Sequence, residues 1–112
     1  MITENTMKTA EAVNLAELTD YVEESIISRT LVKNNAGNLT YMAFGAGQGL
    51  SKHSAPFDAF VQALDGKATI LINDNPHELK AGEAIIMPAN VPHAIQTEEN
   101  FKMLLVMLKS QN

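Results

Sequence analysis

Hydrophobic and polar residues alternate over short stretches from residue 25 to the end of the chain, in the pattern of half-buried β-strands. Residues 25–33 are rich in β-branched side chains, the turn NNAGN follows, and residues 39–44 resume the extended pattern, which predicts a β-hairpin. Further strands are expected at 57–64, 67–73, 77–80, 84–88, 93–97 and 101–108. Residues 45–56 are expected to form a loop. Many short strands at regular spacing predict an all-β antiparallel barrel or sandwich.

The dipeptide Asp65-Gly66 is the strongest turn signal in the chain. Asp-Gly between two alternating stretches is typical of the two-residue turn of a β-hairpin. We therefore expect residues 67–73 to return alongside residues 57–64.

The N-terminal part of the chain follows a different pattern. Residues 1–12 are polar and show no strong periodicity, so we expect a flexible or loosely attached arm before a single domain at 13–112. Asn14 is followed three residues later by Glu17, a capping-box pattern that predicts one short helix.

Composition narrows the class of protein. The 112 residues fit one globular domain, with 46% hydrophobic and 19% charged residues. The net charge of −5 and eight scattered basic residues, with Arg29 the single arginine, argue against a nucleic-acid partner. The chain has no cysteine, which excludes thiolate nucleophiles and zinc–thiolate sites. The longest apolar run, 103–108, is too short to cross a bilayer, so we expect no membrane association and a cytoplasmic location.

A first motif begins in the stretch before the Asp-Gly turn. Gly47 is followed after five residues by His53, and Gly66 closes the motif. Ala55 and Ala59 lie between them at positions where donor side chains would be useful, and neither carries a donor atom.

A second motif lies in the stretch GEAIIMPANVPHAIQT. Gly82 is followed after five residues by Pro88, and His93 comes five residues later, with Asn90 and Thr97 on either side of it. Asparagine tolerates a left-handed backbone conformation, so Asn90 can serve where a glycine would otherwise make the turn.

The spacing of the two motifs resembles that of the cupin superfamily, in particular its small single-domain barrels, over residues 39–108. The resemblance implies a double-stranded β-helix, or jelly-roll barrel. In metal-binding cupins a second histidine stands at the position of Ala55 and a glutamate at that of Ala59. The resemblance therefore carries over two metal ligands, His53 and His93, for an ion such as Zn, Fe, Ni or Mn, whereas stable sites usually have three or four protein donors. It also implies a homodimer, in which residues 25–33 either complete a sheet or pair with a second copy.

His77 is a further candidate ligand, because it alternates with Leu79 and can face the barrel interior. A partly buried strand histidine with a backbone partner is the alternative reading. A pocket inside the barrel would be lined by His53, Ala55, Phe57, Ala59, Val61, Met87, His93 and Met103, and its apolar walls would extend to Ile70, Ile72, Ile86, Leu105 and Met107. Each apolar residue in this set is equally well explained as core.

Two functions remain open from the sequence. In the first, the barrel binds a small organic ligand through His53 and His93 without a full metal site. In the second, the same histidines and an unconventional third donor hold a divalent ion in a metal-dependent enzyme of the oxygenase or isomerase type. The fold does not choose between them.

Overall fold

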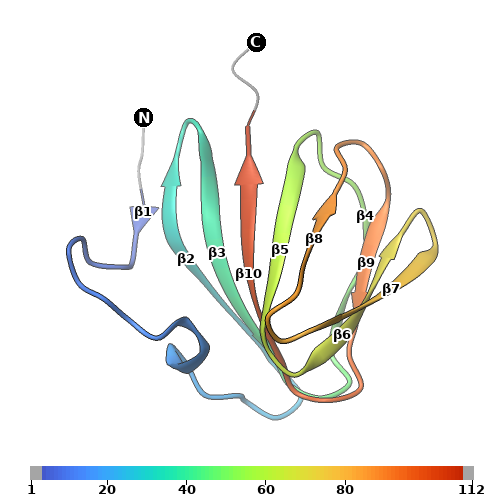
Figure 1. Cartoon of the computed structure of the whole chain (residues 1–112), viewed down its shortest axis with the longest axis horizontal. Coiled ribbons are helices and arrows are strands. Elements are labelled where there is room, and N and C mark those ends of the chain that lie inside the picture. Colours follow the sequence, from blue (N-terminus) through green and yellow to red (C-terminus); the bar gives the residue numbers. More distant parts are fainter. Residues whose placement is uncertain (1–3, 110–112) are drawn as a thin grey trace.

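The computed structural model describes residues 4–109 and is built almost entirely of β-strands (Figure 1). Its elements are β1 (Glu4–Asn5), the 3-10 turn η1 (Leu15–Glu17), β2 (Ile26–Asn34), β3 (Gly37–Phe44), β4 (Gly49–His53), β5 (Asp58–Asp65), β6 (Lys67–Ile72), β7 (Asn75–Lys80), β8 (Ala84–Met87), β9 (His93–Gln96) and β10 (Phe101–Leu108). In this part of the chain, sheet A has the strand order β1-β2-β3-β10-β5-β8 and sheet B the order β4-β9-β6-β7. All pairings are antiparallel.

The two sheets pack face to face, and their inward-pointing side chains form the main core. The core alternates along each strand, as the period-2 pattern of the sequence predicts. Its buried members are Met42, Phe44, Ala59, Val61, Ala63, Ala68, Ile70, Leu79, Met87, Ile95, Phe101 and Met103. The expected all-β jelly-roll barrel is confirmed.

The first expected hairpin is also confirmed. Strands β2 and β3 pair from Ile26↔Phe44 to Asn34↔Gly37, and Asn35 and Ala36 form the turn. The register shifts between Thr30 and Val32, which marks a β-bulge around Leu31.

The predicted hairpin at Asp65-Gly66 is wrong. Strand β5 pairs with β10 and β8 in sheet A, whereas β6 pairs with β9 and β7 in sheet B. Gly66 is the single residue between the two strands, too short a link for a two-residue hairpin turn, and its φ of 73° sends the chain from one sheet to the other. The Asp-Gly signal marks a corner of the barrel.

The two-residue hairpin turn lies further along, at Asn73-Asp74. Both residues have positive φ, 50° and 66°, as in a type I′ turn, and the flanking pair Ile72↔Asn75 closes the hairpin of β6 and β7. Asn90 also has a positive φ, 64°, so the expectation that asparagine takes the left-handed position there is confirmed.

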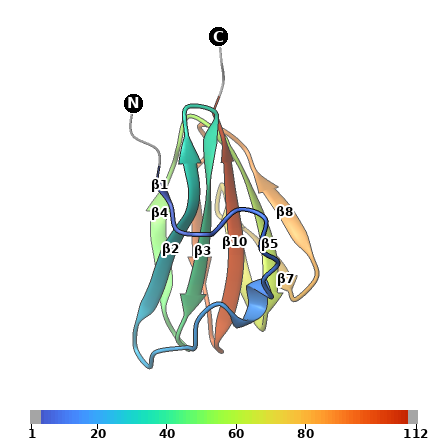
Figure 2. The same ribbon diagram turned by 90° about the vertical axis from the view of Figure 1, so that its left-hand side faces the viewer.

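The N-terminal segment runs across the outer face of sheet A, as Figure 2 shows. Asn14 caps η1 by accepting a hydrogen bond from the backbone N–H of Ala16 at 3.1 Å. The predicted helix is therefore a single 3-10 turn with the expected cap. No helix in the described part of the chain is long and apolar enough to span a membrane.

This segment covers a second, smaller core. Leu31, Tyr41 and Ala43 are buried on the outer face of sheet A. The side chains packed against them come from the segment and from neighbouring strands: Met7, Leu15, Leu18, Tyr21, Ile27, Val32, Leu39, Leu64 and Leu104.

Lys102 attaches the segment to the sheet. Its side chain is 7% exposed, Nζ donates to the carbonyl oxygen of Ala16 at 2.6 Å, and Nζ lies 4.7 Å from the ring centroid of Tyr21. The Tyr21 hydroxyl donates to the carboxylate of Asp65. Burial, and then the Asp65 carboxylate, raise the pKa of Tyr21, so it remains a hydrogen-bond donor.

Nearer the N-terminus, Thr6 forms hydrogen bonds with residues of β2. Its hydroxyl donates to the carbonyl oxygen of Thr30 at 2.5 Å, and Arg29 donates to Thr6 through Nε and Nη2. The Arg29 guanidinium therefore holds the N-terminal residues against β2 through hydrogen bonds. The mobility expected for the arm 1–12 and the homodimer stay predictions.

Candidate functional site

The candidate site lies at one end of the barrel, where β4 and β8 end and β5 and β9 begin. This end, at the top of Figure 1, is called the barrel mouth. Two short loops meet there: the backbone N–H of Asn90 donates to the carbonyl oxygen of Ala55 at 2.7 Å, and that of Ala89 donates to Oδ1 of Asp58 at 2.9 Å. These bonds fix the loop before β5 against the loop before β9, so both histidines are held by rigid elements.

His53 and His93 face each other across neighbouring strands of sheet B. They are direct register partners in the β4–β9 pair, their ring centroids lie 4.5 Å apart, and the rings meet edge to face at 73°. His93 is 4% exposed, whereas His53 is exposed. The predicted pair is therefore brought together, with one ring inside the barrel and one at its opening.

Backbone carbonyls fix which nitrogen of each ring carries the proton. Nδ1 of His53 lies 2.7 Å from the carbonyl oxygen of Ser51, and Nδ1 of His93 lies 3.2 Å from that of Val91. Because a carbonyl oxygen can only accept, each Nδ1 must be the donor. In the neutral rings each Nε2 then carries a lone pair, and no described residue donates a hydrogen bond to it.

The environment keeps His93 neutral. Burial, followed by the proximity of His53, lowers the pKa of His93, and the hydrogen bond to Val91 opposes this only in part. At pH 7 the His93 ring is therefore an uncharged acceptor.

The lowered pKa of His93 predicts a loss of stability on acidification. As the pH falls below about 6.5, the unfolded chain takes up a proton at this histidine that the folded chain resists. The contribution of His93 is thus fully present above that pH and is lost as the pH falls through the pKa of the folded state. We expect the melting temperature to drop more between pH 7 and pH 5 in the parent protein than in His93→Gln, measured by circular dichroism at constant ionic strength. Equal drops in the two proteins would contradict this assignment.

The other predicted pocket residues lie at two depths. Ala55 and Phe57 are half-buried in the loop that follows β4. The deeper set belongs to the packed core: Ala59, Val61, Met87 and Met103. They point into the barrel interior and are buried in its core, and their role as pocket walls stays a prediction.

Ile86 does not belong to the predicted apolar wall. It is 59% exposed and lies on the outer face of sheet A, where it pairs with Phe60. Met87 and Ile85 have the inward parity on β8, since they pair with Ala59 and Val61.

The residues present do not make a complete metal site. Ala55 and Ala59 supply no donor atoms, and His77 is exposed on the edge strand β7, opposite Ile70. Across residues 4–109, no three or more histidine, aspartate or glutamate side chains are grouped so as to hold an ion. His53 and His93 alone are a two-donor set, short of the three or four protein donors of stable sites.

Two features of the mouth were not predicted. The first is β4 itself, which was expected to be part of a loop. Only one of its five residues, Leu50, packs against the core, so the strand has no alternating hydrophobic pattern to detect.

The second is Lys109, which follows β10. Met103, Leu105 and Met107 all belong to or pack against the main core, so the alternation of β10 gives Lys109 the same inward parity. Its Nζ lies 5.9 Å from the ring centroid of Phe57. Extending the alternation of 101–108 by one residue would have found it.

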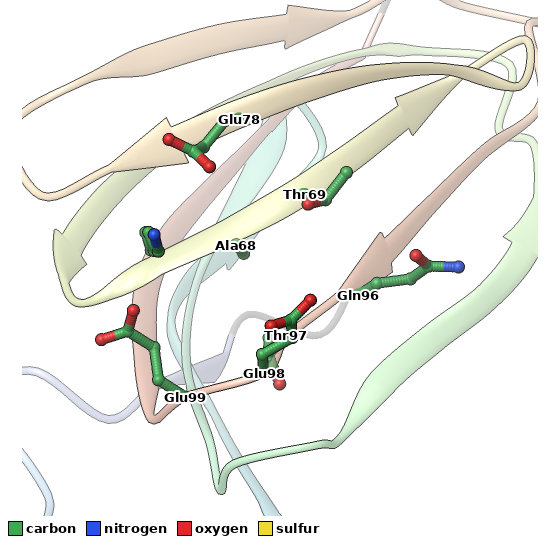
Figure 3. Close-up of a pocket in the computed structure, with 8 residues that line it drawn as sticks. Ala68, Thr69, Glu78, Gln96, Thr97, Glu98 and Glu99 are labelled. Atoms are coloured by element: carbon green, nitrogen blue, oxygen red, sulfur yellow. The ribbon is translucent and has the colours of Figure 1, made fainter.

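A separate polar cleft of about 290 Å³ lies where β6, β7 and the end of β9 meet, as Figure 3 shows. Thr69 pairs with both Glu78 and Gln96, which form one row across the strands. The cleft is lined by Lys67, Ala68, Thr69, Glu78, Gln96, Thr97, Glu98 and Glu99. Its lining includes neither His53 nor His93, so it is a different surface from the barrel mouth.

A two-sheet jelly roll with a histidine from each of two spaced motifs is typical of a cupin domain. The model of the family described as the cupin domain matches residues 39–108, and the chain belongs to this family. The sequence-based assignment to the cupin superfamily is confirmed.

Solved structures agree with this membership. A conserved protein of unknown function from Streptococcus pyogenes is 34% identical, with a TM-score of 0.91 over 100% of this chain and 98% of that one. A cupin 2 conserved barrel domain protein from Leptotrichia buccalis is 44% identical, with a TM-score of 0.84 over 87% of this chain. This match spans 47% of the Leptotrichia protein, about half its length.

A cupin superfamily protein from Desulfitobacterium hafniense has a TM-score of 0.88 at 24% identity, over 98% of this chain and 100% of that one, which supports the fold alone. No curated protein matches the chain. The comparisons therefore establish a cupin domain protein and leave its specific activity to the site.

Proposed function

We propose that the barrel mouth binds a small organic ligand through Nε2 of His53 and Nε2 of His93. The observation that carries the proposal is the close pair of rings, 4.5 Å apart, whose Nδ1 atoms are both occupied by backbone carbonyls. In the neutral rings two lone pairs are thereby presented at one end of the barrel without a partner among the described residues. An unpaired acceptor in a partly desolvated position favours a ligand that supplies the missing donor.

The surroundings support a ligand of mixed character. Phe57 and Ala55 are half-buried beside the pair, and the core side chains Met87 and Ala59 lie below the mouth. The apolar floor favours a carbon skeleton, whereas the two imidazoles fix its polar groups. We therefore expect binding and orientation as the primary role of the site.

A metal-dependent enzyme is the second candidate function, and the same two Nε2 atoms favour it, because imidazole nitrogen is a common ligand of divalent ions. The donor set is incomplete, so solvent or substrate would have to supply the remaining ligands. Metal content by inductively coupled plasma mass spectrometry separates the two functions: near-stoichiometric metal in tag-free protein, absent from the His53→Ala, His93→Ala double variant, would favour the enzyme.

We predict that His53→Ala and His93→Ala abolish ligand binding and leave the fold intact. Neither side chain belongs to the main core, and each Nδ1 bond is local, so the free energy of unfolding should change by at most about 2 kcal/mol. Binding is measured by screening a library of small metabolites against ¹⁵N-labelled protein and following backbone amide shifts at the two loops of the mouth. Stability is measured by urea denaturation.

The control variant is His77→Ala, which removes an exposed imidazole from the same sheet without touching the pair. It should bind the same library members as the parent protein. Unfolding of both His53→Ala and His93→Ala would show that the pair is structural, and unchanged binding in both would refute the proposed site.

A further inference from the structure

Lys109 places a positive charge at the barrel mouth. Its backbone N–H donates to the carbonyl oxygen of Ala36 at 2.9 Å, which fixes the chain beyond the end of β10 against the turn between β2 and β3. From there the side chain reaches over Phe57, with Nζ 5.9 Å from the ring centroid. Phe57 in turn lies in the short loop that begins after His53.

The charge of Lys109 is not neutralised by an ion pair with any described residue. The ion pair found in residues 4–109 joins Lys52 to Asp74, at 2.7 Å. The nearest acid in sequence to Phe57 is Asp58, which accepts the hydrogen bond from Ala89 and has the outward parity of β5. At 5.9 Å a cation–π contact is at the outer limit of its range and satisfies the ammonium only weakly.

The inner face of sheet A next to the mouth is apolar. Ala59 pairs with Met107 on one side and with Met87 on the other, so the three form one row across β10, β5 and β8 on the inner face of sheet A. Ala59 and Met87 are 2% and 3% exposed. The row offers a carbon chain a surface with no hydrogen-bonding groups of its own.

The histidine pair imposes a different demand on the ligand. Both Nδ1 atoms are already donors to backbone, so in the neutral rings both Nε2 atoms are acceptors, and they match hydroxyl groups. A carboxylate at the same place would set acceptor against acceptor. The mouth therefore has a cationic side at Lys109 and an accepting side at His53 and His93.

We infer that the ligand of the barrel mouth is a small hydroxy acid, whose carboxylate binds Lys109 and whose hydroxyl groups donate to Nε2 of His53 and His93. This inference rests on the proposed function and specifies its ligand class. Lys109 is the recognition residue that distinguishes acids from neutral polyols.

Three six-carbon probes distinguish the carboxylate that would bind Lys109 from the hydroxyl groups that would bind the histidines. Gluconate carries both, sorbitol carries only hydroxyl groups, and hexanoate carries only a carboxylate. Binding is measured by isothermal titration calorimetry and by amide shifts of the full chain at pH 7. We expect gluconate to bind best. Lys109→Ala should weaken gluconate binding about fivefold, the effect of an exposed ion pair, and leave sorbitol unchanged.

The matched control is Lys80→Ala, which removes a lysine from β7 and should not affect any of the probes. Gluconate binding that is unchanged in Lys109→Ala, or hexanoate binding as tight as that of gluconate, would overturn the inference. Sorbitol binding that is lost in His93→Ala, with no preference for gluconate, would overturn the hydroxy acid and support the proposed function. If none of the three probes binds, the hydroxy-acid assignment fails, and the library screen tests the broader site independently.

Discussion

Replacing Gly66 by alanine is expected to lower the free energy of unfolding by about 3 kcal/mol or more. Two effects add at this corner. The φ of 73° is strained for any residue with a side chain, and a Cβ at Gly66 would lie 2.0 Å from the carbonyl oxygen of Asn100. That oxygen belongs to the backbone just before β10, the neighbour of β5 in sheet A, so relief of the clash requires the end of β5 and the start of β10 to move apart. Urea denaturation followed by circular dichroism measures the change.

Gly82→Ala is the matched control for this variant. Gly82 also has a positive φ, 90°, but a Cβ built there meets no atom within 4 Å. Gly82→Ala should therefore lower the free energy of unfolding by about 1 to 2 kcal/mol, the cost of the left-handed conformation alone. Equal losses in the two variants would show that the close approach of Gly66 to Asn100 does not matter.

Truncating Phe101 to alanine is expected to cost about 3 to 5 kcal/mol. The Phe101 ring has 0% exposure and lies 5.9 Å from that of Phe44, at the end of the barrel opposite the mouth, so its removal leaves a cavity between the sheets. A loss of this size is a large share of the stability of a small domain. Chemical denaturation at several protein concentrations gives the free energy and detects aggregation.

Phe101→Leu provides a second measurement if the alanine variant does not fold. It leaves a smaller cavity and should lower the free energy of unfolding by about 1 to 2 kcal/mol. Phe60→Ala serves as the comparison on the outer face of the same sheet, where the ring is half-buried, and about 1 kcal/mol is expected. If Phe101→Ala lowers the free energy of unfolding no more than Phe60→Ala does, Phe101 is not part of the rigid core.

Much of the fold was predictable because it depends on local signals. The β2–β3 hairpin follows from β-branched residues around a polar turn, and Asn90 occupies the left-handed position expected of it. The Asp65-Gly66 signal was misleading, because a positive φ fixes a local bend and does not specify which strands pair afterwards. Pairing depends on partners far along the chain, here β10 for β5 and β9 for β6.

The candidate site was predictable only in part. The spacing of the two motifs placed His53 and His93, and the structure brings them together. Their proton positions depend on the carbonyls of Ser51 and Val91, which point toward the rings only once β4 and the loop before β9 have formed. Lys109 lay outside the motifs, so its place over Phe57 follows from the register of β10 with β5.

Because residues before β3 pack on sheet A, the region matched by the family model is smaller than the packed structure. The matched region, 39–108, begins inside β3 and omits β2 and everything before it. A fragment with those limits would leave Tyr41 and Ala43 facing water and would turn β3 into an open edge strand. Unpaired backbone groups beside an apolar face promote self-association. Domain boundaries for expression or for grafting this barrel should therefore include the strands and the N-terminal residues that cover sheet A, and should not stop at the limits of the family match.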